Sequence, residues 1–244
     1  MKTTLPKTTK SEPRRGVPDV HSPFSSLIAI GQAIKLRNPF IRDRTQGGTK
    51  LVSEHPASAF AESFRLLALN LQVMLAESEN KAVAVISPYA GDGRSCIAAN
   101  LAVTLGEAGH TLLVECSQDE DGSLREMMLA ERRNGAEAPA AIPVGSLATR
   151  HPGVWLLPGT VARVRNEPGA LQEAAARASK DGIYTIVDTP PAAKSSTAFS
   201  LAREVGQAIY VLPSKTPDLD VHRRIKEQLE RLDVRILGLV TDEA

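Results

Sequence analysis

The residues best suited to chemistry lie in one short segment, Ser87-Pro-Tyr-Ala-Gly-Asp-Gly-Arg-Ser95. It follows an apolar run, 82–86, and precedes an apolar pattern with helical spacing. A strand, a glycine-rich turn and a helix in this order present backbone N–H groups to a phosphate at the helix N-terminus. A complete P-loop ends in Gly-Lys-Ser/Thr, whereas this segment ends in Gly93-Arg94-Ser95. The segment therefore predicts a phosphate-binding loop in which arginine replaces the lysine.

Two further apolar runs end in carboxylates, Asp188 after 184–187 and Glu115 after 112–114. An aspartate after a strand is weak evidence by itself, since many helix N-caps have the same pattern. Carboxyl ends of parallel strands meet at one edge of a sheet, so both carboxylates should lie beside the loop. We predict that Ser95 and Asp188 hold the Mg²⁺ of a bound ATP. The residues expected to contact the nucleotide are Ala90, Gly91, Asp92, Gly93, Arg94, Ser95 and Cys96.

The elements that must position these residues are predicted from the hydrophobic pattern. Apolar runs without polar alternation indicate strands covered on both faces, at 82–86, 111–116, 154–157, 183–187, 208–212 and 236–240. Helical spacing indicates helices at 57–75, 95–108, 121–133, 167–180, 195–204 and 217–232. Strands that alternate with helices predict an α/β fold, a doubly wound and mostly parallel sheet.

The chain is expected to divide at residue 50. Residues 1–50 are rich in proline and contain ten Lys or Arg against three acidic residues, which predicts a disordered basic arm. Within it, Leu27, Ile30 and Ile34 have helical spacing, which is open to two interpretations, a short surface helix or a solvated linker. Residues 51–244 would form the P-loop domain. Basic residues of the arm would approach an anionic membrane surface.

The overall composition narrows the classes of function. A formal net charge of +1 argues against a dedicated nucleic-acid binder. Cys96 and Cys116 have no metal-ligand spacing and fit small core residues in a reducing compartment. No window approaches the ~20 apolar residues of a membrane span. We therefore expect a cytoplasmic protein that reaches the inner face of the inner membrane through a partner.

Three motifs make the chain resemble the cytoplasmic domain of bacterial tyrosine kinases, which serve polysaccharide co-polymerases in capsule and exopolysaccharide assembly. They are His55-Pro-Ala-Ser-Ala-Phe-Ala-Glu62-Ser-Phe-Arg65-Leu-Leu, the loop with Ala98-Ala-Asn100-Leu-Ala, and Asp188-Thr-Pro-Pro191. The resemblance covers roughly residues 54–240. It implies a P-loop NTPase-like fold, ATP with Mg²⁺ as cofactor, catalytic roles for Asp188 and Glu115, and homo-oligomers built through Glu62 and Arg65.

The chain departs from the family pattern at four places. Arg94 replaces the loop lysine, and its broad planar guanidinium does not occupy the space of an ammonium group. Ser117 stands where the family has a second aspartate on the strand that ends near Glu115, and Ala68 stands where the ring-forming helix has a second arginine. The C-terminal tyrosine cluster is absent, and the three tyrosines are Tyr89, Tyr184 and Tyr210. Together these departures indicate a pseudokinase.

The leading hypothesis is a cytoplasmic regulatory or scaffold subunit of a system for capsule, exopolysaccharide or holdfast export. It would act with a separate inner-membrane co-polymerase and bind ATP weakly or not at all. The first alternative is an active tyrosine kinase that phosphorylates partners in trans. The second is a partitioning or positioning ATPase, against which the Asp188-Thr-Pro-Pro191 sequence and the 55–67 motif argue.

Overall fold

The structure of the protein is a computed structural model that describes residues 33–37, 51–117, 123–129, 137–159, 167–212 and 218–243. For residues 33–37, 123, 242 and 243 it describes the backbone alone. None of the helices within these ranges is long and apolar enough to cross a bilayer.

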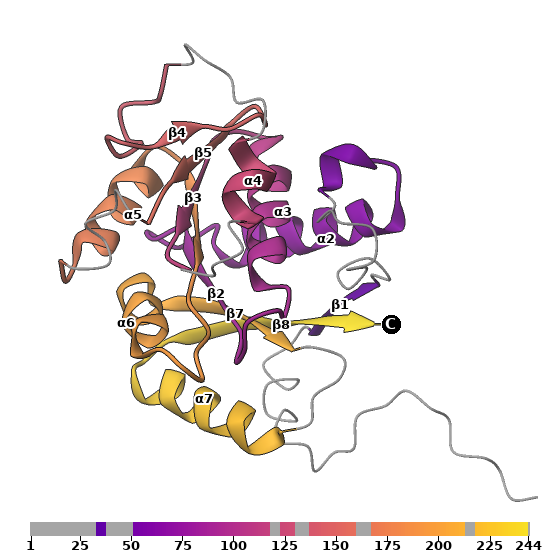
Figure 1. Ribbon diagram of the computed structural model, residues 1–244. Helices are drawn as coiled ribbons and strands as arrows, with labels where there is room; N and C mark the ends of the chain where they lie inside the picture. The colour runs from indigo at the N-terminus through magenta and orange to yellow at the C-terminus, as the bar shows by residue number, and fades with distance from the viewer. Residues whose placement is uncertain are drawn as a thin grey trace, which may run out of the picture.

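The described chain forms one eight-stranded sheet in the order β1-β8-β7-β2-β6-β3-β5-β4 (Figure 1). All neighbouring strands are parallel except β4 and β5, which are antiparallel. The strands are β1 Ala33–Arg37, β2 Ala82–Ile86, β3 Thr111–Glu115, β4 Leu147–Ala148, β5 Val154–Leu157, β6 Tyr184–Asp188, β7 Gln207–Leu212 and β8 Arg235–Glu243. The predicted fold class, a doubly wound and mostly parallel sheet, is confirmed.

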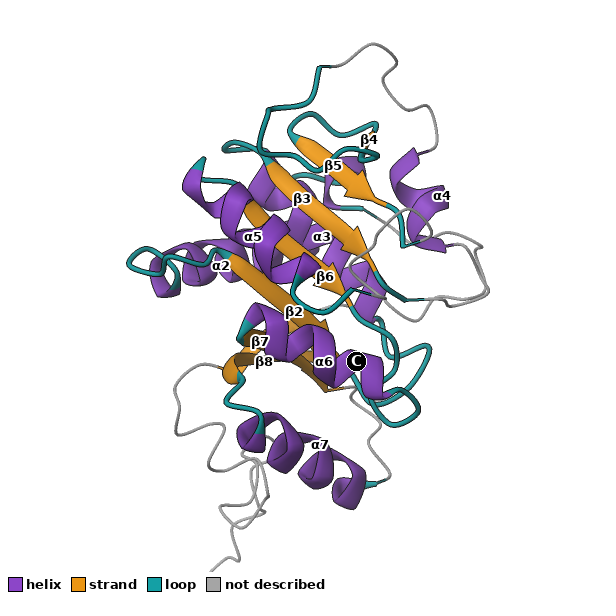
Figure 2. Cartoon of the chain, turned by 90° about the vertical axis from the view of Figure 1, so that its left-hand side faces the viewer, coloured by secondary structure: helices purple, strands orange, loops and turns teal. Residues whose placement is uncertain are grey.

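Helices cover both faces of the sheet, as Figures 1 and 2 show. They are α2 Ala59–Met74, α3 Arg94–Gly106, α4 Ser123–Leu129, α5 Ala170–Lys180, α6 Ser196–Val205 and α7 Leu219–Arg231, with a short 3-10 helix, η2, at Val52–Glu54. The central strand β2 shows the division, because Val83 and Val85 pack with α2, α3 and α4. Ala84 and Ile86 point to the opposite face, toward α6 and α7. Every residue of β2 is buried, which explains its continuous apolar sequence.

Asn100 ties the start of the domain to α3. Its Oδ1 accepts the backbone N–H of Val52 at 2.7 Å, and its Nδ2 donates to the carbonyl of Cys96 at 2.9 Å. The side chain is fully buried, so the polar atoms depend on these partners. The Ala-Ala-Asn-Leu-Ala stretch thus combines small residues for close helix packing with one buried anchor.

One part of the predicted arm differs from the expectation. Residues 33–37 form β1, which pairs in parallel with β8, with Ile34 opposite Val240 and Arg37 opposite Glu243. Neither a surface helix nor a solvated linker describes this segment. The physical reason is the long strand β8, whose outer edge would otherwise carry unpaired N–H and C=O groups. Residues 1–32 and 38–50 of the predicted arm lie outside the described residues.

Candidate nucleotide site

The predicted phosphate-binding loop joins the end of β2 to the start of α3. Gly91 and Gly93 both have φ near 81°, in the left-handed region that glycine adopts without strain. Gly93 is the N-cap of α3 and has no side chain with which to cap this helix. The Asp92 carboxylate accepts the backbone N–H of Tyr89 at 2.8 Å and so shapes the loop. The loop therefore has the strand–turn–helix geometry that its sequence predicts.

The side chain of Arg94 does not extend over this loop. It is only 2% exposed, and it turns toward the ends of three neighbouring strands. Nη1 donates to the Ser87 hydroxyl after β2 at 3.0 Å, and Nη2 donates to the Ser117 hydroxyl after β3 at 3.1 Å. Nε donates to Oδ1 of Asp188, at the end of β6, at 3.2 Å. The planar guanidinium thus joins β2, β3 and β6, a geometry that a lysine ammonium group does not reproduce.

Asp188 is fully buried, and both of its carboxylate oxygens accept hydrogen bonds. Oδ1 accepts from Arg94, and Oδ2 accepts from the Ser95 hydroxyl at 2.8 Å. Its backbone carbonyl accepts the N–H groups of Cys116 and Ser117, which fixes the end of β3 beside β6. The negative charge of Asp188 is therefore balanced by Arg94 inside the fold.

The carboxylate of Glu115 is engaged elsewhere. Its Oε2 accepts from Nε of Arg125 on α4 at 2.7 Å and from the backbone N–H of Gly159 after β5 at 3.3 Å. Glu115 is opposite Asp188 in the β3–β6 register, so the two residues do lie on adjacent strands as predicted. Their carboxylates, however, pair with different cations, Glu115 with Arg125 and Asp188 with Arg94. Glu115 holds α4 and β5 to the sheet.

These contacts allow a test of whether the site fits Mg²⁺. The ion takes oxygen ligands that offer lone pairs and negative charge, and it usually binds through one or two carboxylates. Here the Ser95 hydroxyl donates to Asp188 and keeps its own lone pairs available, but the other Asp188 oxygen faces a buried guanidinium. A divalent cation beside Arg94 would add charge to a site that is already balanced. Ser95 could therefore ligate a magnesium ion, but Arg94 held against Asp188 does not fit one.

The Asp188-Thr-Pro-Pro191 segment and the residues after it are hydrogen-bonded to the end of β2 and to the start of the phosphate-binding loop. The hydroxyl of Thr189 donates to the carbonyl of Val85 at 2.8 Å, across β2 and β6. The N–H groups of Ala192 and Ala193 donate to the carbonyls of Ser87 and Pro88. Sequence reasoning missed these roles of Ser87 and Thr189. The available signal was the presence of small hydroxyl residues directly after two adjacent strands.

Comparison with known proteins shows which of them this chain resembles in sequence. No family model matches it. Over 92% of its length the chain is 27% identical to the succinoglycan biosynthesis transport protein ExoP of Rhizobium meliloti (strain 1021). Over 31% of its length it is 33% identical to the tyrosine-protein kinase CapB of Staphylococcus aureus. The matches span only 29% and 31% of these two relatives.

Solved structures give the same relationship at the level of the fold. The kinase domain of the Escherichia coli tyrosine kinase ETK has a TM-score of 0.67 at 16% identity and covers 94% of this chain and 95% of its own. The chimeric protein CapA2B2 has a TM-score of 0.63 at 21% identity, with coverage of 91% and 97%. The chain is thus similar in sequence to a polysaccharide biosynthesis transport protein and shares the fold of bacterial tyrosine kinase domains.

The helix that contains the Glu62 and Arg65 motif is α2, Ala59–Met74. Glu62 and Arg65 form an exposed ion pair of 3.1 Å, and Arg65 also donates to the carbonyl of Pro56. Ala68, at the third position of the motif, is only 5% exposed and packs in the core. Three exposed apolar side chains share this helix: Leu66, Leu69 and Val73. The outer face of α2 is thus apolar beside a single ion pair.

Two of the three tyrosines lie on strands of the sheet, Tyr184 on β6 and Tyr210 on β7. Tyr210 on β7 is fully buried, and its hydroxyl is 2.8 Å from Nδ1 of His222 on α7. Burial raises the pKa of Tyr210 strongly, and the nearby Asp92 and Tyr89 raise it further. Burial also raises the pKa of Tyr184, which is partly exposed on β6. A hydroxyl buried like that of Tyr210 is inaccessible to a kinase.

Proposed function

We propose that the chain is a regulatory or scaffold component of a system that synthesises and exports a capsule, exopolysaccharide or holdfast polymer. The observation that carries the proposal is the buried contact of Arg94 with Asp188, Ser87 and Ser117. The side chain that would hold a nucleotide phosphate instead joins three strands. The family relationship supplies the polysaccharide context, since ExoP is named a succinoglycan biosynthesis transport protein.

The energetic cost of opening this site supports an impaired nucleotide site. If Arg94 turned toward a phosphate, Asp188 would stay buried without its cation. Breaking a buried pair in this way costs about 3–5 kcal/mol. That cost corresponds to a loss of roughly two to four orders of magnitude in nucleotide affinity. Backbone N–H groups of the loop would supply whatever affinity remains.

The proposed partners rest on the resemblance to these relatives and on the exposed face of α2. The chain corresponds to less than a third of ExoP, so other parts of that protein have no counterpart in the matched region. We propose that a separate inner-membrane co-polymerase supplies the membrane part and holds this chain at the cytoplasmic face. Copies of the chain would associate through α2, where Glu62 and Arg65 lie beside exposed Leu66 and Leu69.

An active tyrosine kinase acting in trans is the second candidate. The retained loop, Ser95 and Asp188 favour it, as does the fold shared with the ETK kinase domain. Incubation of the purified chain with radiolabelled ATP, Mg²⁺ and the cytoplasmic tail of a co-polymerase separates the two candidates. Phosphotyrosine that disappears in Ser95→Ala would establish the kinase. No incorporation above the Ser95→Ala background is the result that the scaffold predicts.

Complementation in the source bacterium tests the proposed role itself. Deletion of the coding sequence should lower the exported polymer, measured as cell-surface and medium carbohydrate. Ser95→Ala should restore the polymer to the wild-type level, because the scaffold does not need the nucleotide. Equal protein levels on an immunoblot provide the control. If Ser95→Ala behaves like the deletion at normal protein level, the site is used and the scaffold role is wrong.

A further inference from the structure

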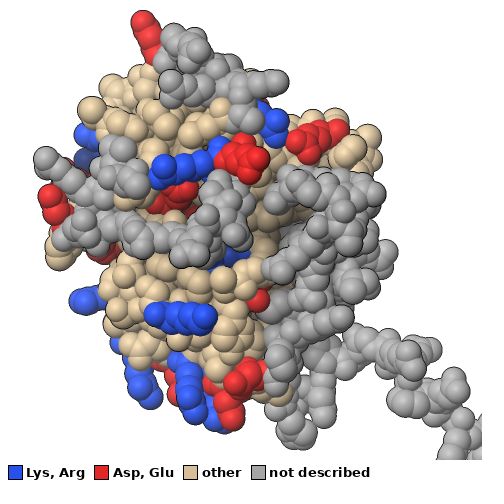
Figure 3. All heavy atoms as spheres, in the orientation of Figure 1, with Lys and Arg blue, Asp and Glu red and all other residues tan. Residues whose placement is uncertain are grey.

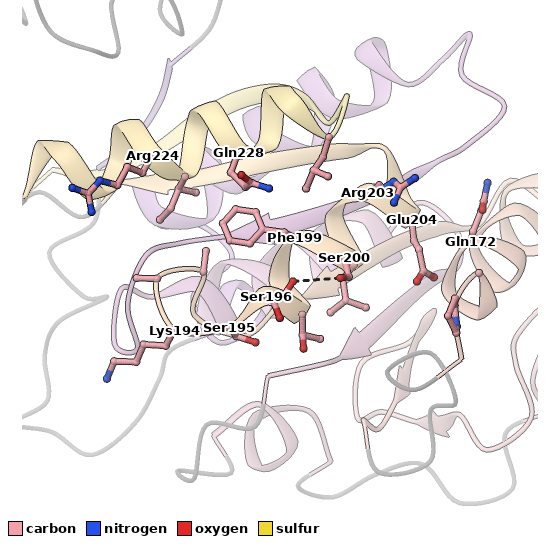
Figure 4. Close-up of a pocket in the computed structure, with 18 of the residues that line it drawn as sticks. Gln172, Lys194, Ser195, Ser196, Phe199, Ser200, Arg203, Glu204, Arg224 and Gln228 are labelled. Atoms are coloured by element: carbon pink, nitrogen blue, oxygen red, sulfur yellow. Dashed lines mark hydrogen bonds between the residues drawn. The ribbon is translucent and has the colours of Figure 1, made fainter.

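A groove of about 1070 Å³ lies between α6 and α7, on the face of the sheet opposite α2 and α3 (Figure 4). It extends from the segment before α6 to the start of α5, and it is separate from the candidate nucleotide site. Ligand pockets for small molecules usually measure about 300–1,000 Å³. The groove lies at the upper end of this range and is therefore large enough for a segment of polypeptide.

The floor of the α6–α7 groove is apolar and incompletely covered. Phe199 of α6 lies between the two helices with its ring directed toward α7. Phe199, Val221 and Leu232 are only partly buried, although each packs against the core beneath them. The fully buried Ile225 completes the floor from α7. A row of partly exposed apolar side chains between two helices is the surface on which a third helix packs.

The charges on the rim are distributed unevenly along the groove. Lys194 and Arg224 lie together at one end, whereas Arg203 and Glu204 lie at the other (Figure 4). Neither Lys194 nor Arg224 forms an ion pair with a residue that the structure describes. The outer face of α7 differs, because its charges pair within the helix: Arg223 with Asp220, Lys226 with Glu230 and Arg231 with Glu227. Figure 3 shows these mixed charges over the end of the molecule formed by α7.

We propose that the α6–α7 groove binds an amphipathic helix of a partner protein, with acidic residues placed against Lys194 and Arg224. Such a helix would bury two or three apolar side chains at i, i+3 or i+4, and i+7 over Phe199. The residues before position 51 of this chain are a poor occupant, because they contain ten basic and three acidic residues. The α7 helix has 13 residues, about 20 Å, so a partner segment of roughly 12–16 residues matches its length.

The inference goes beyond the proposed function and does not use the nucleotide site. A displayed library of randomised peptides of about 16 residues, selected against the full chain, provides the probe. The selected peptides are expected to have apolar residues at helical spacing and acidic residues at one end. Their affinity should fall at least tenfold with Arg224→Glu or Lys194→Glu, and with Phe199→Ala, each checked for an unchanged melting temperature. Arg231→Glu is the matched control, since it lies on the same helix outside the groove, and it should change affinity by less than twofold.

Charge exchange makes the test specific. A peptide with its acidic residues changed to lysine should bind Arg224→Glu more tightly than it binds the wild type. Three outcomes would overturn the inference: selected peptides without acidic bias, peptides indifferent to Phe199→Ala and Arg224→Glu, or displacement by a peptide of residues 1–32. In the last case the occupant is this chain itself. None of these outcomes depends on whether nucleotide binds, so the proposed function is tested separately.

Discussion

Nε of Arg94 lies 3.2 Å from Oδ1 of Asp188, and the two side chains are 2% and 0% exposed. The pair occupies the place where a P-loop protein would hold a phosphate and a metal ion. The guanidinium supplies the positive charge beside Asp188 that a metal ion would otherwise bring. Both carboxylate oxygens of Asp188 therefore have partners within the protein.

The first prediction concerns stability. Arg94→Met should lower the free energy of unfolding by about 3–5 kcal/mol, because it leaves Asp188 buried without a cation. The double variant Arg94→Met/Asp188→Asn should recover part of this loss, since the uncompensated charge is then gone. Urea denaturation of the wild type, both single variants and the double variant measures the coupling energy.

Arg223→Met is the control for this cycle. Arg223 is half-exposed on α7 and pairs with Asp220, so its loss should cost less than about 1 kcal/mol. If Arg94→Met costs no more than this surface variant, the buried pair does not support the fold.

The second prediction concerns the packing of α3 against β5. A Cβ on Gly153 would collide with the carbonyl oxygens of Gly106 and Gly109, and Gly153 has a φ of 79°. Gly153→Ala should therefore destabilise the domain by at least about 2 kcal/mol in chemical denaturation. Gly109→Ala meets nothing within 4 Å and serves as the control, with an expected change below about 1 kcal/mol. Similar values for both variants would mean that the contact at Gly153 is not tight.

The third prediction concerns pH. Burial lowers the pKa of His151 from 6.5 to about 4, assisted by the charge of Arg150 and opposed by Glu54. Nε of Arg150 donates to Nε2 of His151 at 3.1 Å, which requires the neutral ring. Between pH 6.5 and about 4 the unfolded chain binds a proton that the folded chain does not. Stability should therefore fall as the pH falls through this range, by up to about 3 kcal/mol from this group.

His151→Gln should flatten that part of the profile of unfolding free energy against pH. Burial also lowers the pKa of His222, so the wild type and the variant share a residual slope that cancels in their difference. The exposed His110→Gln provides the control and should keep the wild-type slope. If the difference between wild type and His151→Gln is independent of pH, His151 is not held neutral by the fold.

The fourth prediction concerns association through α2. Leu69 is 56% exposed in the apolar face that also contains Leu66 and Val73. Leu69→Glu should shift the sedimentation coefficient toward that of the monomer, because a buried unpaired carboxylate opposes assembly. Val144→Glu is the control, since Val144 is 98% exposed and lies far from α2 in the sequence. Equal sedimentation of both variants and the wild type over a range of concentrations would exclude this interface.

The sheet could be predicted from sequence because buried parallel strands have continuous apolar runs. The run 82–86 became β2 and 154–157 became β5 without a shift in either boundary. β1 could not be predicted in this way. Its alternation of Ala33, Ile34 and Leu36 with two basic residues is too short to indicate a strand, and its partner is about 200 residues away in the chain.

The positions of the loop, Glu115 and Asp188 could be predicted from the sequence, but the contacts of the side chains there could not. The topology brings the loop, Glu115 and Asp188 to neighbouring strand ends, as the sequence indicated. The direction of a long side chain is decided by what surrounds it. Arg94 can bond to Ser87, Ser117 and Asp188 only when three strands are aligned. Glu115 can bond to Arg125 only when α4 packs beside β3. No pattern along the sequence indicates these side-chain contacts.

Calorimetric titration of ATP and ADP, with and without Mg²⁺, tests the central claim most directly. The account predicts no saturable binding to the wild type below millimolar nucleotide and no effect of Mg²⁺. Arg94→Lys should gain Mg²⁺-dependent binding, because a lysine leaves Ser87 and Ser117 and returns a compact charge to the loop. Micromolar, Mg²⁺-dependent binding to the wild type would contradict the account.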